Sequence, residues 1–318
     1  MEIMVVFVNT MGTSEGSEVT PSRLILPMLG VASAFKFRTP LGTGATTFAN
    51  INGMAEGILK SDQYAITMLE PFLFSLIPMV MVGLYCVFAW RLMPKHTNIN
   101  QAAVKDTVKE STMTPTQEKI VYVVFSVTML IMILNKWTGN LMYLAPAMGV
   151  LVLIWCKVLP VKDAVNSMTG DMIWMLAGVL VVSNALGASG AGDLIGNVLL
   201  SMIGENPSSF GTMLLFSAVT VIMTNLMSNM GTQTVLIPIA ASVALAGGWD
   251  PRGLLLIAGV ANMSDVAMPS GSGEAAVAFA AGGYNPFDPK VLRFTVPYML
   301  VTILAYAISA HLMFPLYG

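Results

Sequence analysis

The stretch TNLMSNMGTQTVLIP, from Thr224 to Pro238, places polar side chains inside an apolar segment of the chain. Seven of its fifteen residues are Ser, Thr, Asn or Gln, and none is charged. Their hydroxyl and carboxamide oxygens are hard ligands that suit Na⁺, and the same groups donate hydrogen bonds to a carboxylate. Interrupted helices at membrane depth are tolerated only where they face protein or a cavity, so the stretch predicts an internal polar site.

The composition of the whole chain predicts that lipid surrounds this site. Of the 318 residues, 55% are hydrophobic and 10% are charged, whereas an ordinary globular chain has about 25% charged residues. At about 20 residues a span, the apolar content suffices for roughly eight or nine spans. No segment shows the alternation of a membrane β-barrel, and a net charge of −2 excludes nucleic acid as a partner. We therefore expect an all-α polytopic membrane protein.

The distribution of polar segments divides the chain into three parts. Residues 1–92 form a partial first repeat whose N-terminus is short, and they begin with no signal peptide. Residues 93–118 form a polar loop, which the positive-inside rule places in the cytoplasm. Residues 119–318 form a second repeat, in which the Gly- and Ser-rich segment 171–203 is expected to be a re-entrant hairpin.

The two halves are related by an internal repeat. At an offset of 229, residues 30–49 align with residues 259–278 and share seven of twenty positions. Proline and alternating glycines are what repeat, and Arg23 and Arg252 stand upstream in the same register. Hydrophobic segments that Gly and Pro interrupt at corresponding positions are typical of inverted-repeat secondary transporters, whose site lies near the bilayer midplane. The identical pairs are Gly30/Gly259, Val31/Val260, Ala32/Ala261, Pro40/Pro269, Gly42/Gly271, Gly44/Gly273 and Ala49/Ala278.

Three segments resemble the divalent-anion:sodium symporter family of sodium-coupled dicarboxylate, tricarboxylate and sulfate carriers. Ser228-Asn229-Met230 resembles the family's Ser-Asn-Thr signature, residues 259–283 resemble its Pro-x-Gly-Thr-Pro-Pro-Asn segment, and residues 171–196 resemble its second re-entrant hairpin. The resemblance implies an elevator-type carrier with broken helices that moves succinate, malate or sulfate with Na⁺. It also implies a homodimer in the inner membrane, with Na⁺ as coupling ion and no other cofactor.

The resemblance also implies binding residues. Those of the second repeat are Ser228, Asn229, Gly271 and Ser272, and those of the first are Gly42 and Thr43, with Na⁺ held at Ser228, Asn229 and Ser272. Among the neighbouring hydroxyls, Thr232 and Thr46 are further ligand candidates. The chain departs from the family pattern at Met230, which replaces the motif threonine, and at Gly273-Glu274-Ala275, which replaces Pro-Pro-Asn.

Ionisable residues within apolar segments are functional candidates, because their burial is costly. Lys36 and Asp265 occupy the same repeat position with opposite charges, which favours a gating or structural ion pair. Glu274 lies in the predicted substrate turn, where a carboxylate could bind Na⁺ or carry a proton. The coupling or gating candidates are therefore Asp265, Glu274 and Lys36, with Arg38 as a further ionisable residue.

Other function classes fit the sequence less well. A Ser/His/Asp triad, a zinc motif and a P-loop are all absent from the sequence, which argues against an enzyme. An ion channel remains an alternative, because broken helices and small polar residues also build selectivity filters. A Na⁺/H⁺ or oxyanion antiporter is a second alternative, in which Asp265 and Glu274 would carry ions or protons.

Overall fold

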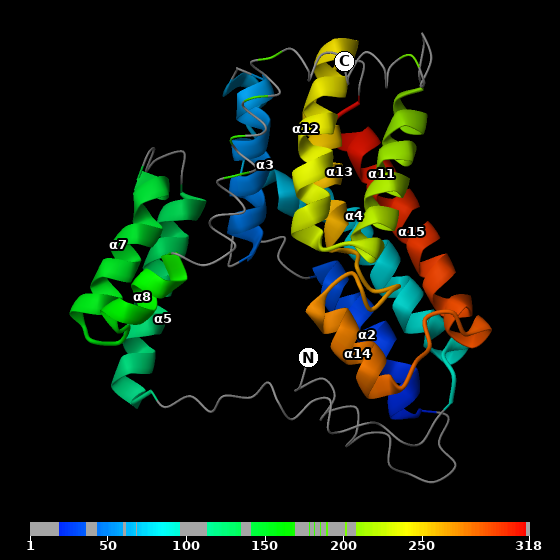
Figure 1. The fold of residues 1–318 in the computed structure, drawn as a ribbon, viewed down its shortest axis with the longest axis horizontal. Coiled ribbons are helices and arrows are strands. Elements are labelled where there is room, and N and C mark those ends of the chain that lie inside the picture. Colours follow the sequence, from blue (N-terminus) through cyan, green and yellow to red (C-terminus); the bar gives the residue numbers. More distant parts are fainter. Residues whose placement is uncertain are drawn as a thin grey trace.

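The computed structural model describes residues 19–35, 43–59, 62–67, 69–95, 113–134, 141–168 and 208–315, together with the single positions 178, 181, 185, 189 and 201. Every regular element in these residues is a helix (Figure 1). The predicted re-entrant hairpin at 171–203 lies outside the described residues except at those five positions.

The helices follow one another along the chain as α-helices with a few short 3₁₀ turns. They are α2 (Pro21–Phe35), α3 (Thr43–Leu59), η1 (Asp62–Tyr64), α4 (Glu70–Ala89), η2 (Trp90–Leu92), α5 (Pro115–Ile133), α7 (Leu141–Trp155), α8 (Val161–Met168), α11 (Ser209–Leu226), α12 (Asn229–Gly247), α13 (Arg252–Val260), η4 (Ala261–Met263), α14 (Gly273–Gly282) and α15 (Pro289–Met313).

Four of the described helices are long and apolar enough to cross a membrane: α4 with η2, α11, α12 and α15. The outer faces of these helices carry large apolar side chains, such as Phe88, which is 77% exposed. In water such faces would be unfavourable, but lipid solvates them. The expectation of an all-α polytopic membrane protein is confirmed.

Local sequence sets the ends of the helices near the predicted site. Ser228 caps α12 by accepting a hydrogen bond from the Gly231 amide, and Ser272 caps α14 by accepting one from the Ala275 amide. Gly248 caps the C-terminus of α12 with φ 66°, a left-handed conformation in which glycine carries no steric penalty. The two serine caps thus place the N-termini of α12 and α14 at the interruptions that the sequence predicts.

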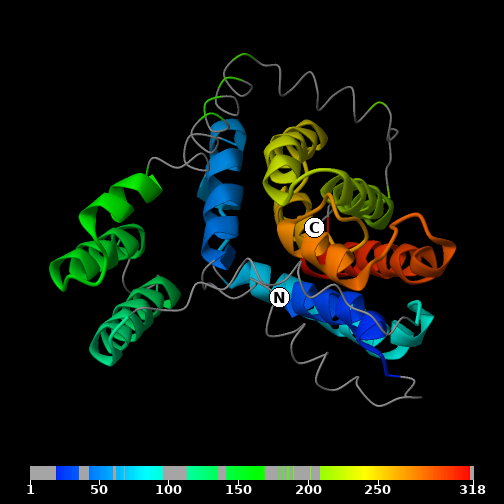
Figure 2. The ribbon, with the colours of Figure 1, turned by 60° about the horizontal axis from the view of Figure 1, so that its bottom comes forward.

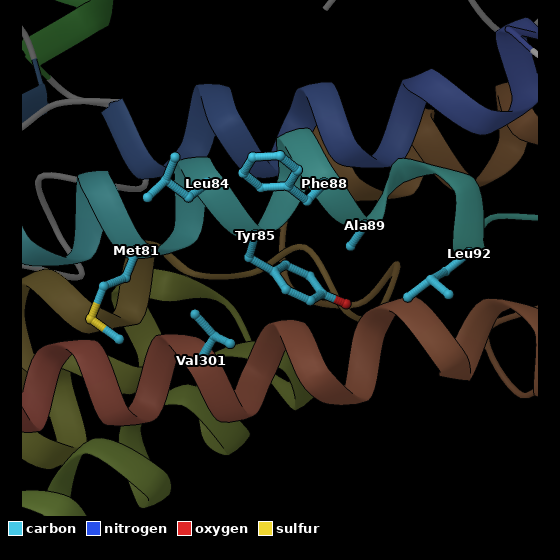
Figure 3. A pocket seen from close by; sticks show the side chains of 7 residues that line it. All are labelled: Met81, Leu84, Tyr85, Phe88, Ala89, Leu92 and Val301. Atoms are coloured by element: carbon cyan, nitrogen blue, oxygen red, sulfur yellow. The ribbon is translucent and has the colours of Figure 1, made fainter.

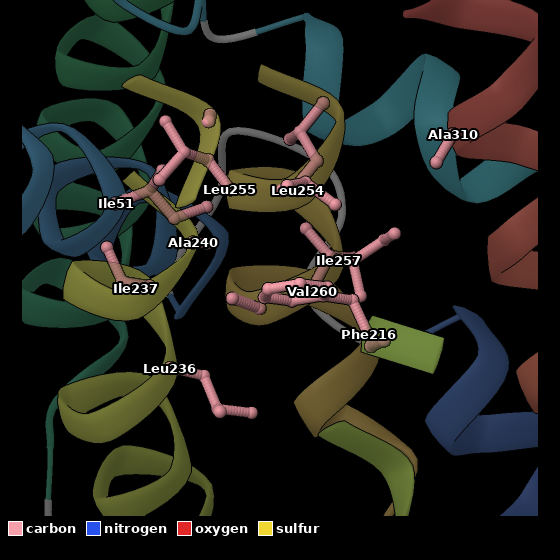
Figure 4. Packing of buried hydrophobic residues seen from close by; sticks show 14 of the residues in the cluster. Ile51, Phe216, Leu236, Ile237, Ala240, Leu254, Leu255, Ile257, Val260 and Ala310 are labelled. Carbon is pink, nitrogen blue, oxygen red and sulfur yellow. The ribbon is translucent and has the colours of Figure 1, made fainter. Parts of the chain in front are cut away.

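The main core surrounds α13, which is apolar on all sides and is buried from Gly253 to Val260. Leu254 and Ile257 of α13 pack with Phe216 of α11 and Leu236 of α12 (Figure 4). Gly259 allows a close approach to α3, because a Cβ there would lie 2.2 Å from the Ile51 side chain. A helix that is hydrophobic all round belongs in a protein interior, and α13 occupies the centre of this one.

The packing of the two halves follows the internal repeat. The segment of α2 and α3 corresponds in sequence to the segment of α13 and α14. α2 packs on α14, α3 packs on α13, and α4 packs on α15. When the two halves are exchanged, the contact of α2 with α14 becomes the contact of α13 with α3, and the contact of α4 with α15 is unchanged. This is the relation that a pseudo-two-fold axis produces. α5 and α7 pack against each other and stand apart from this bundle together with α8 (Figures 1 and 2).

The repeated arginines occupy matching places in this arrangement. Arg23, near the start of α2, donates from Nε to the carbonyl oxygen of Met93, just beyond the end of α4. Arg252, at the start of α13, lies over the ring of Phe314, just beyond the end of α15, at 4.6 Å from the ring centre. Each arginine thus ties the first helix of its repeat to the end of the long helix that closes the repeat.

Replacing Arg252 with Ala should lower the stability of the protein. The guanidinium lies 2.6 Å from Asp250 and 3.5 Å from Glu70, and its side chain is about one third exposed. An ion pair at this exposure and a cation–π contact each contribute roughly 0.5–1 kcal/mol. We expect a loss of about 1–2 kcal/mol, measured as a lower melting temperature in detergent. Lys162→Ala, which removes an exposed charge from α8, should leave the melting temperature unchanged.

Candidate functional site

The candidate site lies where several helix ends meet in the middle of the bundle. α11 ends there, α12 begins there, and the segment from η4 to α14 passes between them. In Figure 1, α12 runs upward from this region and α14 runs downward from it, so their N-termini approach each other. Helix N-termini carry partial positive charge and unpaired amide groups, which favours the binding of anions.

Asn229 links three chain segments at this meeting point. Its Oδ1 accepts a hydrogen bond from Thr224 Oγ1 at 2.7 Å, and its Nδ2 donates to Asp265 Oδ2 at 3.1 Å. Its backbone carbonyl oxygen accepts from Asn262 Nδ2 at 2.8 Å. The first residue of α12 therefore joins the end of α11 to both η4 and the loop that follows it.

The oxygen atoms of this cluster that can accept hydrogen bonds outnumber the hydrogens that are available to them. The Thr224 hydroxyl has a single hydrogen, yet both Asn229 Oδ1 and the Asn262 carbonyl oxygen lie against it. Asn262 is fully buried, and its Oδ1 has no hydrogen-bond partner among the described residues. A buried oxygen without a donor is costly, whereas a cation could accept several such oxygens as ligands. The oxygens of this cluster could therefore serve as ligands for a cation such as Na⁺.

Asp265 supplies the negative charge of this region. The residue is 5% exposed, and besides Asn229 its carboxylate faces Ser33 Oγ at 3.5 Å. Ser33 also donates to the carbonyl oxygen of Met263, so the end of α2 packs on the loop that carries Asp265. Lys36, the predicted partner of Asp265, follows the end of α2 but lies outside the described residues.

Asn225 holds the loop between η4 and α14 in place. Its side chain donates to the Ser264 carbonyl oxygen at 3.0 Å and accepts from the Ala267 amide at 2.9 Å. Its own carbonyl oxygen accepts from Ser270 Oγ at 2.6 Å. Because Asn225 is only 1% exposed, these bonds form in a dry environment. The loop thus takes its shape from a side chain at the end of α11.

Gly271 allows the same loop to approach the backbone of α11. A Cβ at this position would lie 2.9 Å from the Thr224 carbonyl oxygen and 3.0 Å from the Asp265 carbonyl oxygen. Backbone atoms cannot move aside as the end of a flexible side chain can. The close packing of the site therefore requires glycine here, in agreement with its place in the repeated motif.

The predicted residues divide into three groups. Asn229, Gly271 and Asp265 lie together in the site. The hydroxyls of Ser228 and Ser272 cap their own helices, Thr232 donates to the Ser228 carbonyl oxygen, and Glu274 lies in the first turn of α14. Thr43 and Thr46 stand in the first turn of α3, but their side chains lie outside the described residues, as do Gly42 and Lys36.

Three residues of the site were not among the predicted ligands: Thr224, Asn225 and Asn262. Thr224 and Asn225 belong to the polar stretch that begins at Thr224, so their composition was a signal. Asn262 lies within the repeated segment, but its side chain donates to the carbonyl oxygen of Asn229, a backbone atom that leaves no sequence pattern. No group of three or more His, Cys, Asp or Glu residues that could hold a metal ion occurs in the described part of the chain.

A buried amide pair connects the site helix to the first half of the chain. Gln233 Nε2 donates to the Gly259 carbonyl oxygen at 3.0 Å, and Asn50 Nδ2 donates to Gln233 Oε1 at 3.1 Å. Asn50 belongs to α3 and Gln233 lies one turn beyond Asn229 on α12. The polar face of α12 therefore contacts both repeats.

Comparison with known proteins assigns a family to this arrangement. A family model described as "Citrate transporter" matches residues 3–259, which is well over half of the chain. A protein described as an uncharacterized transporter from Synechocystis sp. is 25% identical over 167 residues, which cover 51% of this chain. The matched part spans only 27% of the length of that relative.

Proposed function

The chain belongs to the citrate transporter family, and from this premise we propose that it moves a small carboxylate anion such as citrate together with Na⁺. The family match, and the matching relative that is described as a transporter, support the sequence prediction of a membrane transporter rather than an enzyme. The substrate, the coupling ion and the elevator-type movement are our proposals. So are the homodimer and the placement in the inner membrane.

The observation that carries the proposal is the bridge that Asn229 makes between Thr224, Asp265 and Asn262. A single residue at the start of a broken helix joins neutral oxygens, which suit a cation, to an N-terminus, which suits an anion. Na⁺ at the oxygens and a carboxylate at the amides would stabilise each other, because their charges have opposite sign. Coupling between the two would then arise from this mutual attraction.

The proposed cation ligands are Thr224 Oγ1, Asn229 Oδ1 and the oxygens of Asn262, with Asp265 as the nearby negative charge. Ser228 and Ser272 remain candidates, because a capping hydroxyl oxygen retains acceptor capacity. The first repeat would supply Gly42, Thr43 and Thr46 in the corresponding place. The packing of α2 on α14 and of α3 on α13 supports an inverted repeat of this kind.

Proton coupling is a second candidate function, and Asp265 is the observation that favours it. A buried carboxylate that accepts a hydrogen bond from Asn229 and lies 3.5 Å from the Ser33 hydroxyl could bind and release a proton as the site opens to each side. Glu274 belongs to the same hypothesis, whereas a pairing of Asp265 with Lys36 would act as a gate or as a structural ion pair. In this case a pH gradient would drive transport in place of a Na⁺ gradient.

Uptake of labelled citrate into proteoliposomes that contain the full chain would separate these functions. We expect uptake to saturate with citrate and to rise with an inward Na⁺ gradient at constant pH. Uptake that follows a pH gradient alone, and that Asp265→Asn abolishes, would instead establish the proton mechanism. Unitary currents without saturation would establish a channel, and labelled succinate and sulfate in parallel would test the substrate.

A further inference from the structure

A groove of about 640 Å³ lies between α4 and α15, away from the polar site. Met81, Tyr85 and Ala89 form one i, i+4 row of its lining, and Leu84, Phe88 and Leu92 form a second row on the same helix. Figure 3 shows Val301 of α15 facing the first row, with the Tyr85 ring between the two helices. The Tyr85 hydroxyl donates to the Phe294 carbonyl oxygen, so the exposed lining is almost wholly apolar.

The length of the groove corresponds to one leaflet of a bilayer. From Met81 to Leu92 the helix rises by about 16 Å at 1.5 Å per residue. Half the hydrocarbon core of a bilayer is about 15 Å thick. The groove begins near the middle of the span Glu70–Leu92 and ends at its last residue, which is the depth that the acyl chain of a single leaflet occupies.

Basic residues stand at the end of the groove where a lipid headgroup would lie. Arg91 is exposed, directly precedes Leu92, and has its guanidinium 5.2 Å from the ring centre of Trp90. On α15, Arg293 is also exposed, and its spacing places it on the same helix face as the exposed side chains of Val296 and Leu300. α15 packs against η2, so both arginines belong to the same end of the bundle.

We propose that this groove binds one anionic phospholipid of the surrounding bilayer. An acyl chain lies between α4 and α15, and the phosphate is bound by Arg91 and Arg293, whose planar guanidinium groups match phosphate oxygens. Trp90 lies at the depth of the interface, where amphipathic aromatic rings are favoured. The end that carries these arginines also precedes the polar loop at 93–118, which is the side where the positive-inside rule places the cytoplasm.

Native mass spectrometry of the full chain, titrated in detergent with phosphatidylglycerol or phosphatidylcholine, tests the proposal without measuring transport. We expect the wild-type chain to retain one phosphatidylglycerol in preference to phosphatidylcholine. Arg91→Ala should weaken that preference about fivefold, because a basic residue near an anionic lipid contributes about 1 kcal/mol. Lys162→Ala, which removes an exposed charge on α8, should change nothing.

Two further variants test the groove itself. Ala89→Trp fills it and should abolish retention of the lipid, whereas Val87→Trp, on an exposed face of the same helix outside the groove, should not. Equal retention of both lipids by the wild type would overturn the proposal, and so would retention of phosphatidylglycerol by Ala89→Trp. Dimers of the wild type that Ala89→Trp converts to monomers would overturn it too, because the groove would then be an interface between two copies of the chain.

Discussion

Asn229→Ala should reduce ion-driven citrate uptake about tenfold or more. The change removes the amide donor of the buried Asp265 carboxylate and one of the two acceptors that lie against the Thr224 hydroxyl. Leaving a buried polar group without its partner costs about 1–3 kcal/mol, and more when the group is charged. A loss of this size in ion affinity corresponds to a tenfold change or more. Initial uptake rates measured across a series of Na⁺ concentrations should show a raised half-saturation for Na⁺.

The control for this prediction is Asn285→Ala, at an exposed position in the turn between α14 and α15. That variant loses the same side-chain amide away from the site and should transport as the wild type does. If the Na⁺ dependence of uptake were unchanged in Asn229→Ala, the proposal of a cation site at this position would be wrong. Asn229→Asp adds a second carboxylate about 3 Å from Asp265, so a shift toward pH dependence in this variant would favour the proton mechanism.

Gly271→Ala should impair both stability and transport. The added methyl group would lie 2.9 Å from the Thr224 carbonyl oxygen and 2.9 Å from the Asp265 Cβ. Overpacking against atoms that cannot move costs about 1–3 kcal/mol. Any relaxation would move the Asp265 loop away from Asn229, so we expect a lower melting temperature and a several-fold loss of uptake.

Gly273→Ala provides a matched comparison two residues further on. A Cβ at Gly273 would meet no atom within 4 Å, although both glycines belong to the repeated motif. We expect this variant to retain wild-type stability and uptake. Equal effects of the two substitutions would show that the motif needs backbone flexibility in general and not a close approach at Gly271.

The composition of the chain and the positions of its glycines and prolines predicted the fold, because both are local properties of the sequence. The apolar content predicted membrane helices, and the repeated prolines and glycines marked where the apolar segments are interrupted. Thr43 and Ser272, which correspond in the repeat, stand at the starts of α3 and α14. The repeat relates the contact of α2 with α14 to that of α3 with α13, but only the structure shows that these contacts form.

The details of the site depended on contacts that leave little trace in a sequence. The polar stretch located Asn229, but the side chain of Asn225 bonds to the backbone atoms of residues 264 and 267, which any residue type provides. Asn262 likewise bonds to the Asn229 carbonyl oxygen. Such side-chain-to-backbone bonds depend on how the loop folds. The sequence therefore identified the region and the charge at Asp265, but it could not assign the roles of Asn225 and Asn262.

The buried position of α13 has a consequence for the biosynthesis of the protein. With nine residues, α13 is about 14 Å long, which is half the hydrocarbon thickness of a bilayer. Such a segment cannot be stable as an independent span when it leaves the ribosome, and its neighbour α15 is synthesised after it. Insertion of α13 therefore depends on packing against α3, α11 and α12, and the part of the core that α13 shares with α15 closes only after α15 has been synthesised.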